Sequence, residues 1–137
     1  MLPSTMAIIR IPYHITRSFV IAHSELIFLY GQDYTNKGCL GQAWQMANEA
    51  NSFPVCTMFK LCHSQSDKFF HDDFFQSNVD KIEERLAAVP KDGRAIIAPR
   101  KIGQGHSQLI HKAPRTFDYL KQRLAKIVHP EIEWQYY

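Results

Sequence analysis

The chain lacks the features that would place it in a membrane or mark it for export. No apolar run among its 137 residues approaches the roughly 20 residues that a membrane-spanning helix needs. The N-terminus has no basic segment, and Arg10 and Pro12 interrupt its first apolar stretch, so we expect no signal peptide. Low-complexity stretches, which would indicate disorder, are missing as well. These absences predict a cytoplasmic protein without a membrane partner.

Cysteine is scarce, and its spacing excludes the common cysteine frameworks. Cys39, Cys56 and Cys62 form an odd set without a C-x-x-C pair, which is typical of reduced thiols in a chain without an export signal. Cys62, His63 and His71 come nearest to a metal-ligand set. Adjacent residues of a strand point to opposite faces, however, and no fourth ligand follows at a familiar spacing. We therefore expect no disulfide, no bound metal and no cofactor.

Charge is neither strong nor concentrated along the chain. Sixteen Lys and Arg residues against 13 Asp and Glu residues give a formal net charge of +3. The basic residues are dispersed, whereas a nucleic-acid-binding surface usually shows a concentrated patch with interleaved aromatic residues. A local group at Arg100, Lys101, Lys112 and Arg115 is compatible with a small anionic ligand. We expect no specific nucleic-acid partner and assign most charges to a solvated surface.

What the chain contains is typical of one globular α/β domain spanning residues 1–137. The hydrophobic content is 45% and the charged content 21%, which is sufficient for a buried core at this length. Apolar runs predict strands at residues 6–11, 18–23, 26–30, 53–61 and 94–98. Helical spacing predicts helices at residues 40–50 and 74–89 and a last one that opens at Ala113-Pro114.

The order of these elements predicts the architecture. Strands alternate with helices after residue 26, which favours a mostly parallel sheet with right-handed crossovers and helices on both faces. The N-terminal strands can add an antiparallel edge. Asp72-Asp73 is expected to cap the helix at residues 74–89, and residues 129–137, rich in aromatic side chains, are expected to be extended and docked. The fold class is thus a three-layer α/β domain with a parallel or mixed central sheet, similar to the Rossmann type.

Two glycine-bearing segments, residues 31–41 and 99–107, each follow a predicted strand and precede a helical segment. Ligands of open α/β sheets bind outside the carboxyl ends of the strands, so both segments are expected at one edge. Glycine there serves either a turn that needs positive φ or the close approach of backbone N–H groups to an anion. Neither G-x-G-x-x-G nor G-K-[ST] is present. The pattern alone leaves both interpretations open.

Side chains near these segments are the candidates for chemistry. Asp33, beside the first glycines, is a candidate general base or sugar ligand, or else a turn residue that accepts backbone hydrogen bonds. Lys60, at the end of a predicted strand, is able to pair with a phosphate or to reach solvent. His106 is a candidate acid or base near neutral pH. Cys39 is a weaker candidate nucleophile, since no histidine partner is implied.

Four short stretches of this chain occur in the same order in a known protein family. They are Tyr30-Gly31-Gln32-Asp33, Gly38 with Gly41-Gln42-Ala43, Gly103-Gln104-Gly105, and Ala113-Pro114-Arg115-Thr116-Phe117-Asp118-Tyr119-Leu120. Over roughly residues 26–124 the chain resembles an uncharacterised family of small conserved proteins of T4-like phages and bacteria. This resemblance implies a phage accessory protein that acts in the host cytoplasm, and it assigns no reaction.

More distantly, the layout is similar to macro domains, which bind ADP-ribose between a strand-end Asn or Asp and two glycine loops. The resemblance implies that residues 38–42 face one phosphate, residues 103–106 the other, and Asp33 the distal ribose. Gln32-Asp33 and Leu40 depart from the family pattern, and no run of three or four glycines is present. A carboxylate near a diphosphate is unfavourable unless it contacts sugar hydroxyls, so the departures imply an altered or lost activity.

The expected function is the binding of a nucleotide derivative such as ADP-ribose in a cleft between the two glycine segments, with catalysis left open. The alternative is a non-enzymatic phage accessory protein that binds a host or phage protein. Asp33 is the catalytic candidate. The expected ligand-binding residues are Gly31, Gln32, Gly38, Gly41, Gln42, Lys60, Gly103, Gln104, Gly105 and His106.

Overall fold

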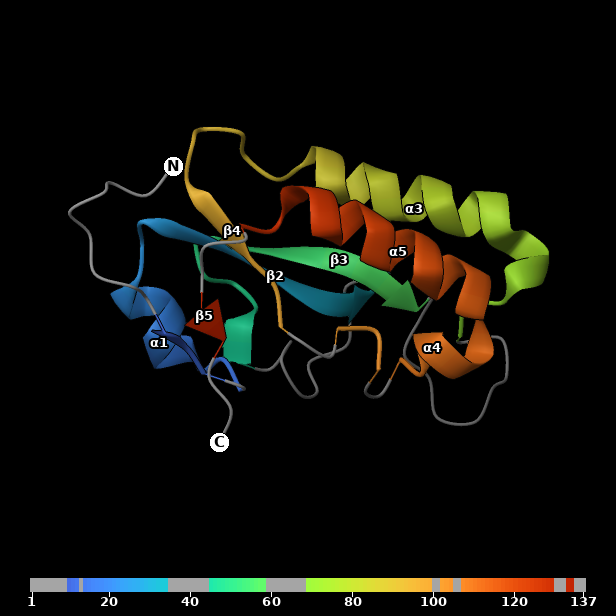
Figure 1. Ribbon diagram of the computed structural model, residues 1–137, viewed down its shortest axis with the longest axis horizontal. Helices are drawn as coiled ribbons and strands as arrows, with labels where there is room; N and C mark the ends of the chain where they lie inside the picture. The colour runs from blue at the N-terminus through green and yellow to red at the C-terminus, as the bar shows by residue number, and fades with distance from the viewer. Residues whose placement is uncertain are drawn as a thin grey trace.

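The computed structural model describes residues 10–12, 14–34, 45–58, 69–99, 102–104, 107–129 and 133–134 (Figure 1). Its centre is a parallel sheet of three strands, β2 (Leu26–Asp33), β3 (Ser52–Met58) and β4 (Ala95–Ile97). The order across the sheet is β3-β2-β4, and both pairings are parallel. The predicted α/β class and the parallel central sheet are therefore confirmed, and the strands predicted at residues 26–30, 53–61 and 94–98 are those that form it.

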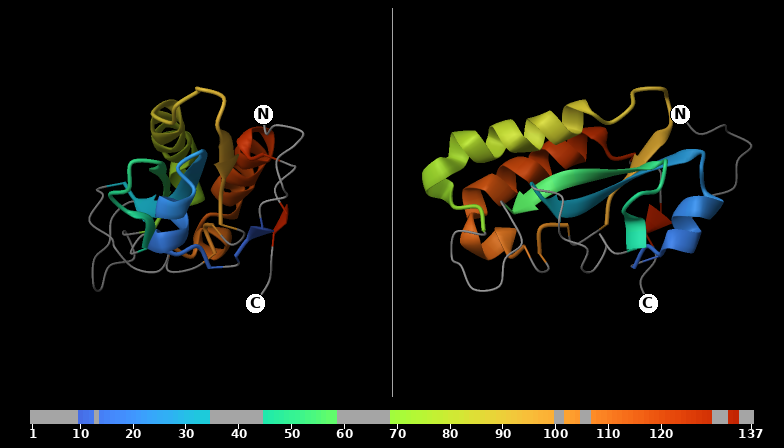
Figure 2. Two further views of the ribbon diagram at one scale, coloured as in Figure 1. Left: turned by 90° about the vertical axis from the view of Figure 1, so that its left-hand side faces the viewer. Right: turned by 180° about the vertical axis from the view of Figure 1, so that it is seen from behind.

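Helices cover one face of this sheet. α3 (Phe75–Ala87) and α5 (Pro114–Ile127) lie side by side over it, and the short α4 (Leu109–Lys112) leads into α5 (Figures 1 and 2). The opposite face packs against α1 (Arg17–Ala22) and the N-terminal segment. A two-stranded ribbon of β1 (Arg10–Ile11) and β5 (Glu133–Trp134) lies near α1. The sheet is thus the middle of three layers.

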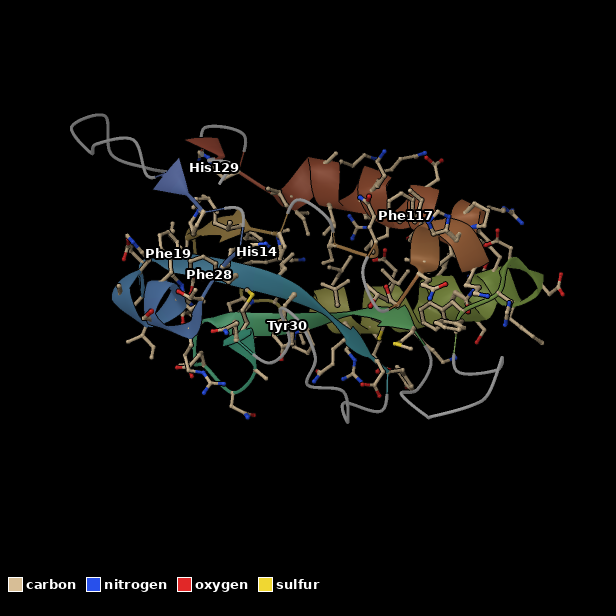
Figure 3. The ribbon with its side chains drawn as sticks, turned by 90° about the horizontal axis from the view of Figure 1, so that it is seen from below. His14, Phe19, Phe28, Tyr30, Phe117 and His129 are labelled. Carbon is tan, nitrogen blue, oxygen red and sulfur yellow. The ribbon has the colours of Figure 1, made fainter. Side chains whose placement is uncertain are left out.

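The alternation of side chains along β2 explains why both faces are covered. Ile27 and Leu29 pack in the cluster that contains the apolar residues of α3 and α5. Leu26, Phe28 and Tyr30 pack in the second cluster, where the rings of Phe28 and Phe19 of α1 lie 5.9 Å apart (Figure 3). A strand buried on both faces reads as a continuous apolar run, because neither set of alternating positions meets water.

The prediction of a strand over residues 18–23 is wrong, because α1 occupies Arg17–Ala22. The Thr16 hydroxyl accepts a hydrogen bond from the Phe19 N–H at 3.3 Å, which caps the first turn of the helix. A short apolar run between two polar segments fits a buried strand and one face of a short helix equally well. The N-cap residue Thr16 distinguishes a helix from a strand here, but it lies outside the apolar run.

The predicted helix over residues 40–50 ends earlier than expected. In its described part only Gln45 and Met46 are helical, and Asn48 has a φ of 70°. The predicted antiparallel N-terminal edge is also wrong, since the described part of residues 6–11, β1, pairs in parallel with β5 outside the central sheet. The pairing of β5 confirms an extended segment within residues 129–137. α4 was not predicted, because four residues are too few to show a helical period.

Asn51 joins these N-terminal elements to the sheet. Its side-chain Nδ2 lies within hydrogen-bond distance of the carbonyl oxygens of Val20 (3.0 Å), His23 (3.1 Å) and Leu26 (3.2 Å). Its own carbonyl accepts from the Phe28 N–H at 2.8 Å. The Val20 and His23 carbonyls also accept backbone N–H groups, those of His23 (3.2 Å) and Leu26 (3.0 Å), so the buried Asn51 amide supplies each with a second partner.

Asp72 caps a helix, but not the helix expected from the sequence. It begins a 3-10 turn, η2 (Asp72–Phe74), ahead of α3, and its carboxylate reaches the first turn of α5 instead. Its oxygens accept from the backbone N–H groups of Arg115 (2.8 Å) and Thr116 (2.9 Å) and from the Thr116 hydroxyl (2.9 Å). Pro114, at the first helical position, has no N–H to satisfy. Asp72 therefore supplies the partners that the start of α5 needs.

The turn that connects β4 to α4 depends on Gly103. This residue has a φ of +83°, and a Cβ added to it would lie 3.2 Å from Phe117 and 3.4 Å from Leu109. Gly93, in the turn predicted at residues 90–93, has a similar φ of +91° with no atom within 4 Å of such a Cβ. The two glycines share one backbone conformation and differ in packing.

We predict that Asp72→Asn lowers the free energy of unfolding by about 1–2 kcal/mol at neutral pH. The amide keeps one acceptor oxygen but loses the other and the negative charge, and a hydrogen bond to a charged group is worth about 1.5–3 kcal/mol. Burial alone would raise the pKa of the Asp72 carboxyl, but hydrogen bonds from the Arg115 and Thr116 backbone outweigh it and lower the pKa. The stabilisation is therefore complete above the unfolded pKa of about 3.9 and is lost as pH falls through the folded pKa.

The measurement is urea unfolding at pH 7 and at several values below pH 4, alongside the neighbouring, exposed Asp73 changed to Asn as the control. The Asp73 variant is expected to stay within about 0.5 kcal/mol of the parent. The gap between the Asp72 variant and the parent is expected to narrow on acidification. Equal losses for both variants at pH 7 would contradict the capping role.

We predict that Gly103→Ala destabilises the fold more than Gly93→Ala. Both changes place a Cβ in the left-handed region, which costs about 1–2 kcal/mol. At Gly103 the new methyl group also meets Phe117, and overpacking adds about 1–3 kcal/mol. Thermal unfolding of both variants tests this, and Phe117→Leu in the Gly103→Ala background is expected to recover part of the loss. Identical melting temperatures for the two alanine variants would refute the packing account.

Candidate functional site

The chain changes direction across the sheet at β2. It passes from β2 to β3 on one side and then crosses, by way of α3, to β4 on the other side. The two connections lie on opposite faces, because Met46 of the first packs in the α1 cluster and Ile82 of α3 in the other. Ligands of open α/β sheets bind outside the carboxyl ends of the strands at such a switch point. The topology therefore directs attention to the carboxyl ends of β2 and β4.

β2 extends beyond β4 at this edge. β4 pairs only with residues Leu26 to Phe28, so the remainder of β2 has no strand beside it on that side among the described residues. The connection after β4 runs there instead, since a Cβ placed on Gly31 would lie 3.5 Å from Ile102 Cγ1. The prediction that segments 31–41 and 99–107 meet at one edge is confirmed for the part that the structure describes.

A bulge in β3 brings Thr57 over the Gly31 backbone. In the sheet register Gln32 pairs with Cys56 and Asp33 with Met58, which leaves Thr57 as the extra residue. A Cβ on Gly31 would lie 3.1 Å from both the methyl group and the hydroxyl of Thr57. Bulges re-aim side chains and occur often beside functional sites. The absence of a side chain at Gly31 thus makes room for a threonine that the bulge directs toward β2.

Asp33 is the last residue of β2, and only 2% of its surface is exposed. The next residue, Tyr34, donates its N–H to the Met58 carbonyl at 2.9 Å, which continues the β2–β3 contact past the bulge. A carboxylate this deeply buried needs hydrogen-bond partners to offset its desolvation. The position agrees better with a carboxylate that organises the strand end than with an openly accessible base, and the catalytic role of Asp33 stays a prediction.

The other expected ligand-binding residues divide into two groups. Among the described ones, Gly31 and Gln32 are half-buried on β2, Gly103 packs against Phe117, and Gln104 is exposed in the connection after β4. Packing and a left-handed backbone are sufficient to explain Gly103. The rest lie outside the described residues: Gly38, Gly41, Gln42, Lys60, Gly105 and His106.

Positive charge reaches this edge from α3. Arg85 donates from Nη2 to the Tyr34 carbonyl oxygen, and its guanidinium carbon lies 5.0 Å from the centre of the Tyr34 ring. Lys81, one helical turn earlier, places Nζ 5.3 Å from the same ring. Within the described part of the chain, Arg85 Nε is buried without a hydrogen-bond partner. Sequence reasoning missed both cations, whose spacing of four residues is also that of an ordinary solvated helix face.

Cys56 lies beside this group, and the residue is 1% exposed. Burial raises the pKa of the Cys56 thiol, and the nearby Arg85 offsets this only in part. The group is therefore a protonated thiol at neutral pH and not an activated nucleophile. Among the described residues no group of three or more His, Cys, Asp or Glu side chains is placed to hold a metal ion.

No described helix has the length and apolar character needed to cross a bilayer. The comparison with curated proteins gave no match, and the comparison with solved structures gave none either.

A family model matches residues 11–123, from the end of β1 to the second half of α5. The matched region contains the whole central sheet, the bulge at Thr57, and the Asp72 contact with α5. It therefore covers both the frame of the fold and the edge where the candidate site lies. Since the match extends over most of the chain, the protein belongs to this family, DUF7831, a family of unknown function.

Proposed function

We propose that this protein binds a phosphorylated nucleoside derivative, of which ADP-ribose is the type, at the carboxyl edge of β2. The observation that carries the proposal is the convergence of Gly31, the bulged Thr57 and Ile102 at the topological switch point. The resemblance to macro domains supports the choice of ligand class. We propose with it that the fold is macro-like and that the protein is of phage origin.

The side chains near this edge suit the parts of such a ligand. The Thr57 hydroxyl is both a donor and an acceptor and is able to bind a ribose hydroxyl or a phosphate oxygen. Arg85 and Lys81 place two cations at the strand end against the one carboxylate of Glu84, which accepts from the Tyr34 hydroxyl at 3.2 Å, and a cation there is able to bind a phosphate. Asp33 is proposed as the partner of a sugar hydroxyl, since a buried carboxylate would repel a diphosphate.

We also propose, as a separate step beyond binding, that the bound ligand is hydrolysed. Hydrolysis of a nucleoside diphosphate derivative needs a base that activates water, and Asp33 is the candidate that the sequence offers. Asp33 and Thr57 are 2% and 3% exposed, so this step requires the strand end to open far enough to admit a water molecule. Binding does not depend on this step, so binding and turnover are tested separately.

The second candidate function is a non-enzymatic accessory protein that binds a host or phage protein. The aromatic tail suggested it, but the backbone of Glu133 and Trp134 pairs with β1, which gives part of the tail a place in the fold. The observation that favours a protein contact is instead the outer surface of α3 and α5, where exposed charges of opposite sign lie on neighbouring helices.

We predict that ADP-ribose binds and that two edge variants weaken it. Thr57→Val removes one hydrogen bond worth about 1 kcal/mol, so the dissociation constant should rise about fivefold. Arg85→Gln removes a charged partner worth about 1.5–3 kcal/mol, which corresponds to an increase of about tenfold or more. Isothermal titration with ADP-ribose, NAD and AMP measures both.

Lys91→Gln is the matched control, because Lys91 is an exposed cation in the turn before β4, at the opposite end of the sheet. Its affinity should equal that of the parent. A thermal-unfolding scan of each variant separates loss of binding from loss of fold. The proposal fails if no nucleotide of the panel gives heat or a shift in melting temperature with the folded parent protein.

A further inference from the structure

Tyr34, the first residue after β2, contacts three charged side chains of α3. Its carbonyl oxygen accepts from Arg85 Nη2, and the centre of its ring lies 5.0 Å from the Arg85 guanidinium carbon and 5.3 Å from Lys81 Nζ. Its hydroxyl donates to Glu84 Oε1 at 3.2 Å. The residue is half-buried and packs against the apolar cluster that contains residues of α3 and α5. One tyrosine thus joins the end of β2 to two cations and one carboxylate.

These contacts hold the Arg85 guanidinium at the strand end. A guanidinium has five N–H donors in a fixed plane, and stacking on an aromatic ring restricts its rotation. Among the described residues, Nε has no hydrogen-bond partner, and no ion pair between described residues includes Arg85. A side chain that is already held in place loses less entropy when it binds an anion. Arg85 is therefore ordered before a phosphate arrives.

Glu84 is the acid that is able to compete with a ligand for these cations. It is exposed and follows Lys81 by three residues, a spacing at which opposite charges attract on a helix surface. No ion pair between described residues includes Glu84, and its carboxylate accepts from the Tyr34 hydroxyl instead. Lys81 Nζ donates to Ser77 Oγ at 2.6 Å, one turn in the other direction. The tyrosine hydroxyl thus takes the place of a cation as the partner of Glu84.

We propose that Tyr34 is the positioning residue of the phosphate subsite. Its carbonyl and ring hold Arg85, and its hydroxyl keeps the Glu84 carboxylate away from Lys81 and Arg85. In this role, which rests on the proposed function, Tyr34 keeps both cations available to the ligand. Without the hydroxyl, the Glu84 carboxylate would turn to a cation, and the ligand phosphate would have to displace it.

A purely structural role for Tyr34 has a different consequence. Phenylalanine keeps the ring that packs against the apolar cluster and lies beside both cations. If only packing mattered, loss of the hydroxyl would act alike whether or not residue 84 carries a carboxylate. The coupling between residues 34 and 84 therefore separates the two roles.

The test is isothermal titration of the full chain with ADP-ribose and with inorganic pyrophosphate at low salt. Tyr34→Phe should raise the dissociation constant about two- to fivefold, the range expected when the ligand has to displace an exposed ion pair. In the Glu84→Gln background the same change should have no effect, because no carboxylate is left to compete. The ratio between Tyr34→Phe and the parent should also shrink at high salt, since screening weakens exposed ion pairs.

Tyr119→Phe is the matched control, because the Tyr119 hydroxyl donates to another glutamate of α3, Glu83, at 2.5 Å. Glu83 binds Arg123 of α5 and not the cations at the strand end. The control should leave the affinity for both anions unchanged, and thermal unfolding of each variant should show that it is folded.

The outcomes distinguish this role from the proposed function. A folded parent that binds pyrophosphate but no nucleotide contradicts the proposed function, and the pyrophosphate titrations then decide the role of Tyr34. An unchanged affinity in Tyr34→Phe, or an equal loss with and without the Glu84 carboxylate, overturns the role of Tyr34 alone. A folded parent that binds neither anion overturns both.

Discussion

The helical layer of this protein depends on one carboxylate that lies far along the chain from the helix it caps. Pro114 opens α5 without an N–H, and Asp72 accepts from the next two backbone N–H groups, those of Arg115 and Thr116. Thr116 is fully buried, and its hydroxyl also accepts from Asn78 of α3 at 3.1 Å. These contacts join η2, α3 and α5 before any apolar side chain is considered. The capping contact thus fixes the start of α5 against η2 and α3, and the apolar cluster between these helices and the sheet holds both over one face.

Asn51 has the corresponding role on the other face. It satisfies carbonyls at the end of α1 and at the start of β2, while its own carbonyl extends the β2–β3 ladder. In both places a polar side chain, the buried Asn51 and the half-buried Asp72, hydrogen-bonds to backbone groups at a helix end. Between these two covered faces, the β2–β3 pairing contains the bulge at Thr57. That irregularity, and the glycine that accommodates it, give the carboxyl edge the features of a binding site.

Patterns that reflect local physics predicted most of the fold. The apolar runs over residues 26–30, 53–61 and 94–98 mark the strands, and helical spacing marks α3 and α5, because burial imposes a period on each element. The run over residues 18–23 was misread because its four apolar residues, 19–22, are too few to show a clear period. Of the candidate site, the meeting of the two glycine segments was predicted from topology. Thr57 and Arg85 were not, since a bulge and a side chain that reaches across from a helix leave no sequence signal.

The sequence by itself determined the α/β class, the parallel direction of the strands and the start of α5 at Pro114. Each of these depends on residues close together in the chain. The prediction that Asp72-Asp73 caps the helix at residues 74–89 was wrong, because Asp72 caps α5 instead. Only the tertiary structure decided which helix. The first turn of α5, not that of α3, comes within 2.9 Å of the carboxylate, and that proximity depends on how two helices pack over a sheet. In the same way, Gly31 is explained by Thr57 of a neighbouring strand and not by its own loop.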